Sequence, residues 1–371
     1  MAAYAPRSIA YLSARALGHA FDVTGHTQKI DGKGGKAAMV YNTGLWSYRL
    51  SVYPGELMPS SDIALTTVIA LSISTQLVFA QSQEFEMIQI PVGEFVFDAA
   101  VAGPEDGDLV IMLHGFPQSW FEYRHQIPIL AEMGFRVVAP NQRGYSPGAR
   151  PHGVDAYVMP NLVGDVLGMA DWLGRERFHL VGHDWGAAVA WYTALASPAR
   201  VQSVVAISVP HPFAFGEALS SPSGQQASMS GYMATFRAAD AEERFLANDA
   251  ALLRSIYDGS GNSADETQVY LDLLGSREAI GAILNWYRAM IVQSAMSSLT
   301  PIRMPTTYVW SSGDVALGRE GAELTEKYIE GPYRFVVIDD IGHWIPEQAP
   351  DQLNEALQVH FKQAARRENR R

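Results

Sequence analysis

The chain has 371 residues, with 39 acidic against 27 basic side chains, a net charge of −12 and no cysteine. The negative charge argues against a nucleic-acid partner, because phosphate binding needs clustered Lys and Arg, and here the only basic cluster is the short C-terminal run 366–371. The absence of cysteine excludes disulfide bonds. The length suffices for a large core and for more than one domain.

The first 80 residues contain one long apolar run, IALTTVIALSISTQLVFA at 63–80, and no sustained period before it. If translation begins at Met58, residues 58–80 are predicted to be a secretory signal peptide, with residues 1–57 an unassigned extension and the mature protein periplasmic or secreted. Otherwise a cytoplasmic protein is expected. The rival interpretations are a membrane anchor, for which the run is too polar, and an apolar segment packed on the body. No stable membrane insertion is expected for the mature body.

From residue 84 the chain alternates short apolar strands with helical stretches, which predicts a mostly parallel sheet with helices on both faces. This pattern covers 84–210 and resumes over 301–365, so both segments are assigned to one core. Between them, residues 211–300 are helix-prone, with amphipathic or apolar runs near 241–257, 264–275 and 279–296. We interpret 211–300 as a helical cap over the carboxyl ends of the strands.

The apolar run DLVIML at 108–113 predicts a buried strand that ends in the loop His114-Gly115-Phe116-Pro117. Further along, FHLVGHDWGA at 178–187 predicts a strand, a tight turn and a helix, with Asp184 between two glycines. The glycines permit a strained turn that lifts the middle side chain above the sheet. A carboxylate at this position is ionised at neutral pH and can attack carbon directly. The competing interpretation is a Gly-bounded turn in which Asp184 only caps the helix.

Two later strands also end in polar loops. TTYVW at 306–310 leads to Asp314, and RFVVI at 334–338 leads to His343. The chain order of nucleophile, acid and His is that of the α/β-hydrolase triad. In such a site the backbone N–H groups of Phe116 and Trp185 are the expected oxyanion-hole donors. Each loop is a weak signal alone, but their consistent order at strand ends is a strong joint one.

Five segments together resemble the epoxide hydrolases of the α/β-hydrolase fold, over residues 84–365. These are HGFPQSWFEYRHQIP (114–128), PNQRGYSPGARP (140–151), VGHDWGAAVAW (181–191), NWYRAM (285–290) and IGHWIPEQAP (341–350). The resemblance implies a mostly parallel central sheet flanked by helices, an inserted helical cap, and a small apolar epoxide as substrate. It implies no cofactor and no metal.

Position by position, the resemblance implies that Asp184 attacks an epoxide carbon and forms an alkyl-enzyme ester. His343, held by Asp314, then activates the water that cleaves this ester. Tyr287 in the NWYR segment and Tyr232 in the GYMATF segment are the implied donors to the ring oxygen, since a phenol with a pKa of about 10 keeps its proton at pH 7. For the second donor, Tyr257 and Tyr270 remain alternatives.

Several tryptophans lie near these motifs, and we expect Trp120, Trp286 and Trp344 to contact the substrate, which indicates an apolar or aromatic epoxide. The sequence does not indicate which epoxide or enantiomer is used, and it leaves the oligomeric state open.

The alternative function is a haloalkane dehalogenase of the same fold, which also forms an alkyl ester on Asp. That family often places an Asn directly after the HG pair, and here the residue is Phe116, whose side chain cannot donate to a halide. Fluoroacetate dehalogenases typically have Arg after the nucleophile, where this chain has Trp185. A non-catalytic ligand-binding protein of this fold is disfavoured, because all three triad positions are filled.

Overall fold

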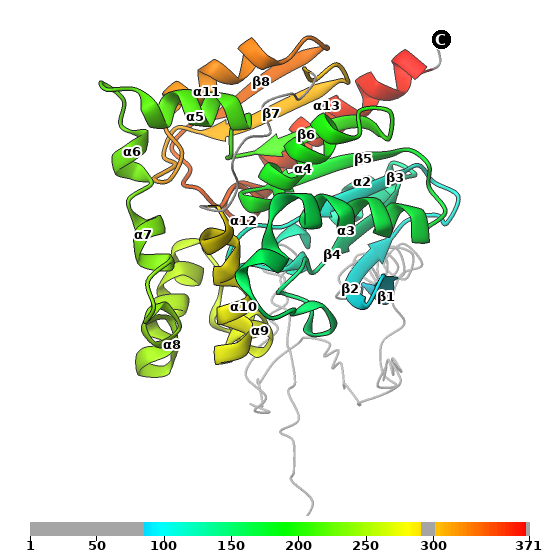
Figure 1. The fold of residues 1–371 in the computed structure, drawn as a ribbon. Helices are drawn as coiled ribbons and strands as arrows, with labels where there is room; N and C mark the ends of the chain where they lie inside the picture. The colour runs from blue at the N-terminus through cyan, green and yellow to red at the C-terminus, as the bar shows by residue number, and fades with distance from the viewer. Residues whose placement is uncertain (1–84, 291–300, 369–371) are drawn as a thin grey trace, which may run out of the picture. The chain divides into compact units, whose positions relative to one another are not determined.

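In a computed structural model, residues 85–290 and 301–368 are described; the predictions for 1–57 and 58–80 lie outside them. The framework of the described residues is an eight-stranded sheet in the order β1-β2-β4-β3-β5-β6-β7-β8 (Figure 1). β1 and β2 pair antiparallel, β2 also runs antiparallel to β4, and the remaining pairs are parallel. The strands are β1 (Glu86–Val92), β2 (Phe95–Ala102), β3 (Leu109–Leu113), β4 (Arg136–Pro140), β5 (Phe178–His183), β6 (Val201–Ile207), β7 (Thr306–Ser311) and β8 (Tyr333–Ile338).

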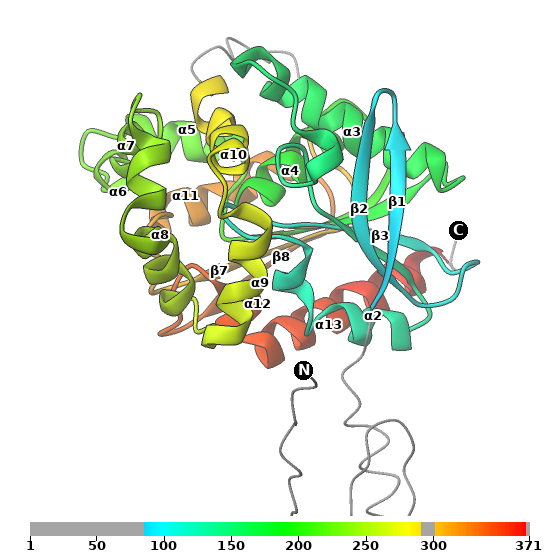
Figure 2. The same cartoon turned by 90° about the horizontal axis from the view of Figure 1, so that it is seen from below.

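Helices cover both faces of this sheet, as expected from the continuous apolar strands (Figure 2). Along β3, alternate side chains enter two different core clusters, Leu109 and Ile111 on one face and Val110 and Met112 on the other. The first face carries α3 (Met159–Trp172), α4 (Trp185–Ala196), α5 (Pro212–Ser220), α11 (Arg319–Leu324) and the 3₁₀ turns η3 (Pro147–Ala149), η4 (Val154–Tyr157) and η5 (Thr325–Tyr328). The second carries α2 (Ile127–Glu132), η2 (Trp120–Tyr123), α12 (Ile345–Gln348) and α13 (Pro350–Glu368).

Between β6 and β7 the described residues are mostly helical. After α5, which packs against α4 and α11, the chain forms α6 (Gln226–Met229), α7 (Tyr232–Phe236), α8 (Ala241–Gly259), α9 (Ala264–Leu274) and α10 (Arg277–Ala289). Figures 1 and 2 show α7 to α10 gathered on one side of the sheet, where strands β5 to β7 end. Residues 291–300, which include the end of the predicted run 279–296, lie outside the described residues.

Local sequence signals set the limits of the cap helices. Ser263 and Glu266 form a capping box at the start of α9, and the Ser276 hydroxyl accepts from an amide in the first turn of α10. The helical run of α8 is interrupted at Ala247–Ala250, where three successive residues have positive φ. Within the described residues, no helix is long and apolar enough to cross a membrane.

A buried polar cluster joins α13 to the sheet. His360 Nδ1 lies 2.9 Å from the Thr307 hydroxyl, and its Nε2 lies 2.8 Å from the Ser203 hydroxyl. Burial, with smaller contributions from His179 and Arg334, lowers the pKa of His360 to about 3. At pH values between about 3 and 6.5 the imidazole is therefore neutral in the folded protein, whereas it would be protonated in the unfolded chain.

Replacing His360 with Gln should weaken the acid sensitivity of folding. The folded pKa lies below the unfolded value, so this group's contribution to stability is present above pH 6.5 and is lost as the pH falls toward 3. The free energy of unfolding is measured by urea denaturation at pH 7 and at pH 5. Its decrease between these two pH values should be smaller in His360→Gln than in the wild type, and the difference should be about 1.4 kcal/mol for each pH unit below 6.5. His152→Gln, at an exposed loop position, is the control and should match the wild type. Equal pH slopes in all three proteins would contradict this assignment.

Candidate active site

Asp184 lies at a sharp turn between β5 and α4, with φ +51° and ψ −121°. A side chain on either neighbouring glycine would collide with backbone: a Cβ on Gly182 would lie 2.3 Å from the Gly186 carbonyl oxygen, and one on Gly186 would lie 1.9 Å from that of Leu113. The fold therefore requires glycine at both positions. The Asp184 side chain is held at the carboxyl end of β5 in a conformation that is strained for an L-residue.

Three residues from three different strand ends meet at this turn. His343 Nε2 lies 3.4 Å from Asp184 Oδ2, and His343 Nδ1 lies 2.9 Å from Asp314 Oδ2. The other oxygen of Asp314 accepts hydrogen bonds from the amides of Ala316 and Leu317, at 2.8 and 3.0 Å. The structure thus brings the predicted nucleophile, base and orienting acid into one hydrogen-bonded row.

One of the two predicted backbone donors contacts the Asp184 carboxylate. The Phe116 N–H donates to Asp184 Oδ1 at 2.9 Å, from the loop that follows β3. Trp185 is the first residue of α4, and its N–H stays a prediction as the second donor. Gly115 allows this approach, because a Cβ there would lie 2.5 Å from the Asp184 Cβ.

Burial and charge act against each other at all three residues, whose side chains are more than 90 % buried. Burial alone would raise the pKa of Asp184, but the hydrogen bond and charge of His343, the charge of His183 and the Phe116 N–H hold it below its ordinary value. Burial would likewise raise the pKa of Asp314, which His343 and the two loop amides keep low. For His343, burial would lower the pKa, and the two carboxylates together raise it to about 10. The two carboxylates on either side therefore favour the protonated form of His343.

Two tyrosines of the cap face this row. The Tyr287 ring, on α10, lies 5.0 Å from the Phe116 ring and 5.3 Å from the Trp185 ring, measured between centroids. Burial, followed by the charges of Tyr232 and Asp184, raises the pKa of Tyr287, and a hydrogen bond with the Trp185 side chain opposes this. Burial and the charge of Asp184 raise the pKa of Tyr232 too, and a hydrogen bond with Tyr287 opposes the rise. Both hydroxyls therefore stay protonated at neutral pH.

The other two candidate tyrosines are engaged elsewhere. Tyr257 donates its hydroxyl proton to the Pro117 carbonyl at 2.7 Å, and Tyr270 donates to Glu347 Oε1 at 2.7 Å. Their rings stack on each other with centroids 4.7 Å apart. Of the tyrosines considered from the sequence, Tyr232 is thus the one that lies beside Tyr287.

The three tryptophans expected to contact substrate lie in different surroundings. Trp120 packs against Phe85 in the second core cluster, whereas Phe116, Trp185 and Tyr287 belong to the first, so we leave Trp120 out of the site. The ring of Trp344 lies beside that of His343, with centroids 4.9 Å apart.

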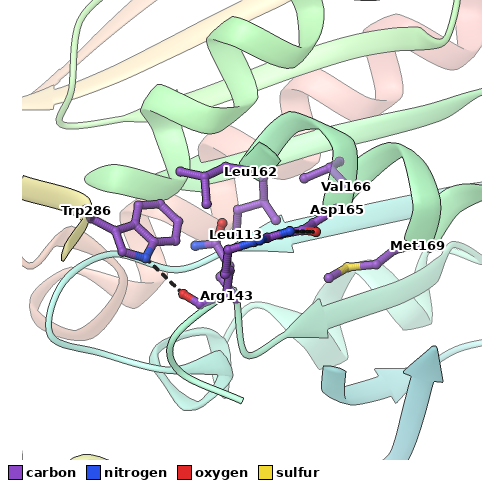
Figure 3. Close-up of a pocket in the computed structure, with 8 residues that line it drawn as sticks. Leu113, Arg143, Leu162, Asp165, Val166, Met169 and Trp286 are labelled. Atoms are coloured by element: carbon purple, nitrogen blue, oxygen red, sulfur yellow. Dashed lines mark hydrogen bonds and ion pairs between the residues drawn. The ribbon is translucent and has the colours of Figure 1, made fainter. Parts of the chain in front are cut away.

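Trp286 anchors helix α10 on the core. Its indole N–H donates to the Arg143 carbonyl at 2.9 Å, and the Arg143 guanidinium pairs with Asp165 at 2.6 Å (Figure 3). The small pocket drawn in Figure 3 is lined by these residues and by side chains of α3, and Asp184 and His343 are not part of its lining. Trp286 therefore positions its neighbour Tyr287 by holding α10 in place.

Sequence reasoning missed a buried carboxylate that ties the cap to the core. Glu347, next to the His343 loop, accepts hydrogen bonds on Oε1 from Arg124 at 3.2 Å, Asn262 at 2.9 Å and Tyr270 at 2.7 Å, and on Oε2 from Gln118. Asn262 and Tyr270 belong to the cap, and Gln118 follows the Phe116 loop. The available signal was that Gln118, Arg124 and Glu347 all lie within the quoted motifs.

Comparison with known proteins shows the family to which the chain belongs. Residues 108–350 match the family model described as alpha/beta hydrolase fold. The chain is 32% identical to the AB hydrolase superfamily protein YfhM of Bacillus subtilis over 268 residues, covering 71% of this chain and 93% of that protein. It is 33% identical to Epoxide hydrolase A of Mycobacterium tuberculosis over 292 residues, covering 69% and 91%.

A solved structure titled "Novel epoxide hydrolases belonging to the alpha/beta hydrolases superfamily in metagenomes from hot environments" superposes with a TM-score of 0.68. It is 32% identical in sequence, with 75% of this chain and 99% of that chain covered. The chain therefore belongs to the α/β-hydrolase fold family and, within it, to the epoxide hydrolases.

Replacing Gly115 with Ala should disable the site without unfolding the protein. The new Cβ would lie 2.5 Å from the Asp184 Cβ, so either the nucleophile or the Phe116 amide must move. A displacement near 1 Å at reacting groups can cost about 100-fold in rate, and we expect a loss of at least that size in epoxide turnover.

Gly164→Ala is the matched control, since Gly164 is exposed in the middle of α3 and a Cβ there meets nothing within 4 Å. It should keep wild-type turnover and gain about 0.5–1 kcal/mol in unfolding free energy. Wild-type turnover in Gly115→Ala would show that the contact between this loop and Asp184 is not needed.

Proposed function

We propose that the protein hydrolyses apolar epoxides to vicinal diols through a covalent ester on Asp184, which water activated by His343 then cleaves. The observation that carries the proposal is one juxtaposition. A buried carboxylate lies between a backbone N–H donor and an imidazole, and two protonated tyrosines face it from the cap. Membership of the epoxide hydrolase family supports the same reaction.

The two oxygens of Asp184 have different surroundings, which suggests different roles. Oδ1 accepts from the Phe116 N–H at 2.9 Å, so this oxygen is suited to be the carbonyl oxygen of the ester. Oδ2, beside His343, is then the oxygen that attacks an epoxide carbon. As the C–O bond of the ring breaks, its oxygen takes a proton from Tyr287 or Tyr232, and a hydroxyalkyl ester forms.

Ester formation changes the charge around His343. The two carboxylates hold the imidazole protonated in the free enzyme, where it cannot act as a base. Alkylation removes the negative charge of Asp184 and one of the two causes of the raised pKa. His343 can then pass its proton to the tyrosinate that ring opening left and take a proton from water. The hydroxide attacks Cγ of the ester, and the Phe116 N–H stabilises the tetrahedral oxyanion. As the C–O bond to the alkyl group breaks, the leaving oxygen takes the proton from His343 to give the diol, and the acid left on Asp184 returns a proton to His343 as the carboxylate re-forms.

The surroundings of Asp184 favour a neutral, apolar substrate. The rings of Phe116 and Phe236 pack against Tyr287, and Phe236 also contacts Tyr232. Phe245 packs in turn against Phe116 and Phe236. Sequence reasoning did not single out Phe236 or Phe245. Such a surface excludes water and places hydroxyl donors only where the ring oxygen develops charge.

The runner-up, haloalkane dehalogenation, requires N–H donors for a departing halide. The Trp185 indole could supply one, but its ring packs edge-on against that of Tyr287, with centroids 5.3 Å apart. The Phe116 side chain packs against aromatic rings and has no N–H to offer. Paired hydroxyls are thus better matched to an alkoxide than to a halide.

The direct test assays diol and released halide side by side from apolar epoxides and haloalkanes. Wild-type protein should form diol, and Asp184→Asn should form none. In His343→Gln, turnover should fall by about 10²–10⁴-fold because the base is lost, and intact mass should show the protein plus one epoxide. Halide without diol would support the dehalogenase, and neither product would contradict both functions.

The proton on His343 in the resting enzyme can be tested separately. Asp184→Asn mimics the neutral ester, so the pKa of His343 should fall below its wild-type value of about 10. Titration of ¹⁵N-labelled imidazole nitrogens by NMR should show His343 losing its proton at lower pH in the variant. An unchanged titration would mean that Asp184 does not control the proton on His343.

A further inference from the structure

Beneath the proposed triad lies a second acid and imidazole that the mechanism above does not use. Glu122, in η2, and His183, the last residue of β5, are both fully buried. Glu122 Oε2 lies 3.2 Å from His183 Nδ1, and His183 Nε2 lies 2.9 Å from the main-chain oxygen of His343.

The two contacts of His183 fix how many protons the pair must hold. A carbonyl oxygen can only accept, so the Nε2 atom facing His343 must carry a hydrogen. A neutral imidazole has one N–H, which leaves Nδ1 as a lone pair facing the carboxyl group of Glu122. That contact is attractive only if Glu122 is protonated, or if His183 carries a second proton. In either form the pair holds one shared proton and is neutral overall.

The setting of Glu122 agrees with a shared proton. Its Oε1 has no hydrogen-bond partner, and an isolated carboxylate buried this way would be costly. Burial raises the pKa of Glu122 to about 6 even though His183 and the Gly115 amide lower it, while the charge of Glu347 adds to the rise. Tyr123, the next residue, donates to the Leu113 carbonyl.

The pair touches both halves of the proposed site. The His343 carbonyl accepts from His183 at 2.9 Å and from the Ser208 hydroxyl at 3.0 Å, so two donors hold the main chain that carries the imidazole. On the other side, the Gly115 N–H points to Glu122 Oε2 at the longer distance of 3.4 Å, next to the Phe116 amide. The connection to the base is therefore the shorter and better formed of the two.

We propose that Glu122 and His183 form a proton-sharing positioning pair that holds the main chain of His343, so that its imidazole is placed to activate water. This inference rests on the proposed function. The pair contacts the main chain of His343 more closely than it contacts the loop that donates to the Asp184 carboxylate. Loss of the pair therefore slows hydrolysis of the ester more than it slows formation of the ester.

The test measures the two steps separately in the full-length protein. Enzyme in excess is mixed with styrene oxide as the probe, quenched with acid at intervals, and the fraction of ester-bearing protein is followed by intact mass. In Glu122→Leu, ester hydrolysis should slow by tenfold or more, while ester formation stays within about threefold of wild type. In Glu122→Gln, whose amide N–H can donate to His183 Nδ1, much of the hydrolysis rate should return.

A loss of packing alone would lower both steps together, and that result would overturn the proposal. Unchanged hydrolysis in Glu122→Leu would overturn it too. Wild-type protein is measured in parallel. If the wild type forms neither ester nor diol, the proposed function is contradicted. If the wild type forms and hydrolyses the ester, any change in the variants reports on Glu122 alone. If Glu122→Leu does not fold, ¹⁵N NMR of the wild type decides. His183 Nε2 must carry a proton, and an unprotonated Nε2 would contradict the pair.

Discussion

The strained turn at Asp184 is the constraint on which the rest of the site depends. Its backbone conformation is tolerated because glycines at 182 and 186 let the end of β5, the start of α4 and the end of β3 approach within backbone contact. The parallel order of the sheet then delivers Phe116, Asp314 and His343 to the same edge, since each follows the carboxyl end of a strand. Backbone packing therefore fixes where these side chains meet Asp184.

Charge is the second organising element. Two buried carboxylates flank one imidazole and raise its pKa. In the proposed mechanism this arrangement keeps Asp184 ionised as a nucleophile and withholds the base until the nucleophile has been consumed. In that mechanism the order of the two chemical steps follows from electrostatics. In the proposed mechanism the cap contributes the proton donors and the apolar walls. The buried Glu347 side chain ties the cap to the loops that carry Phe116 and His343.

Much of this arrangement could be predicted from the sequence, and the reasons are local. Short apolar runs indicate the strands, and the Gly, Asp or His residues that follow them indicate the edge of the sheet where the site lies. The predicted strands at 108–113, 306–310 and 334–338 differ from the observed strands by at most one residue at either end. The cap was harder, because helix packing rather than local pattern decides which aromatic side chain faces inward. Trp120 therefore seemed as close to the site as Trp286 or Trp344, and Phe236 was missed. Glu122 gave only a faint signal, an acid among aromatics in WFEY, and its role depends on long-range contacts with His183.

The central claim is that Asp184 itself supplies the oxygen that opens the ring. The most direct measurement is a single turnover in H₂¹⁸O with enzyme in excess over styrene oxide, followed by mass analysis of the diol and of the peptide containing Asp184. Attack by Asp184 predicts an unlabelled diol, with ¹⁸O in the Asp184 carboxyl group. Label in the diol and none in the peptide would mean that water opens the epoxide directly, and would contradict the covalent mechanism.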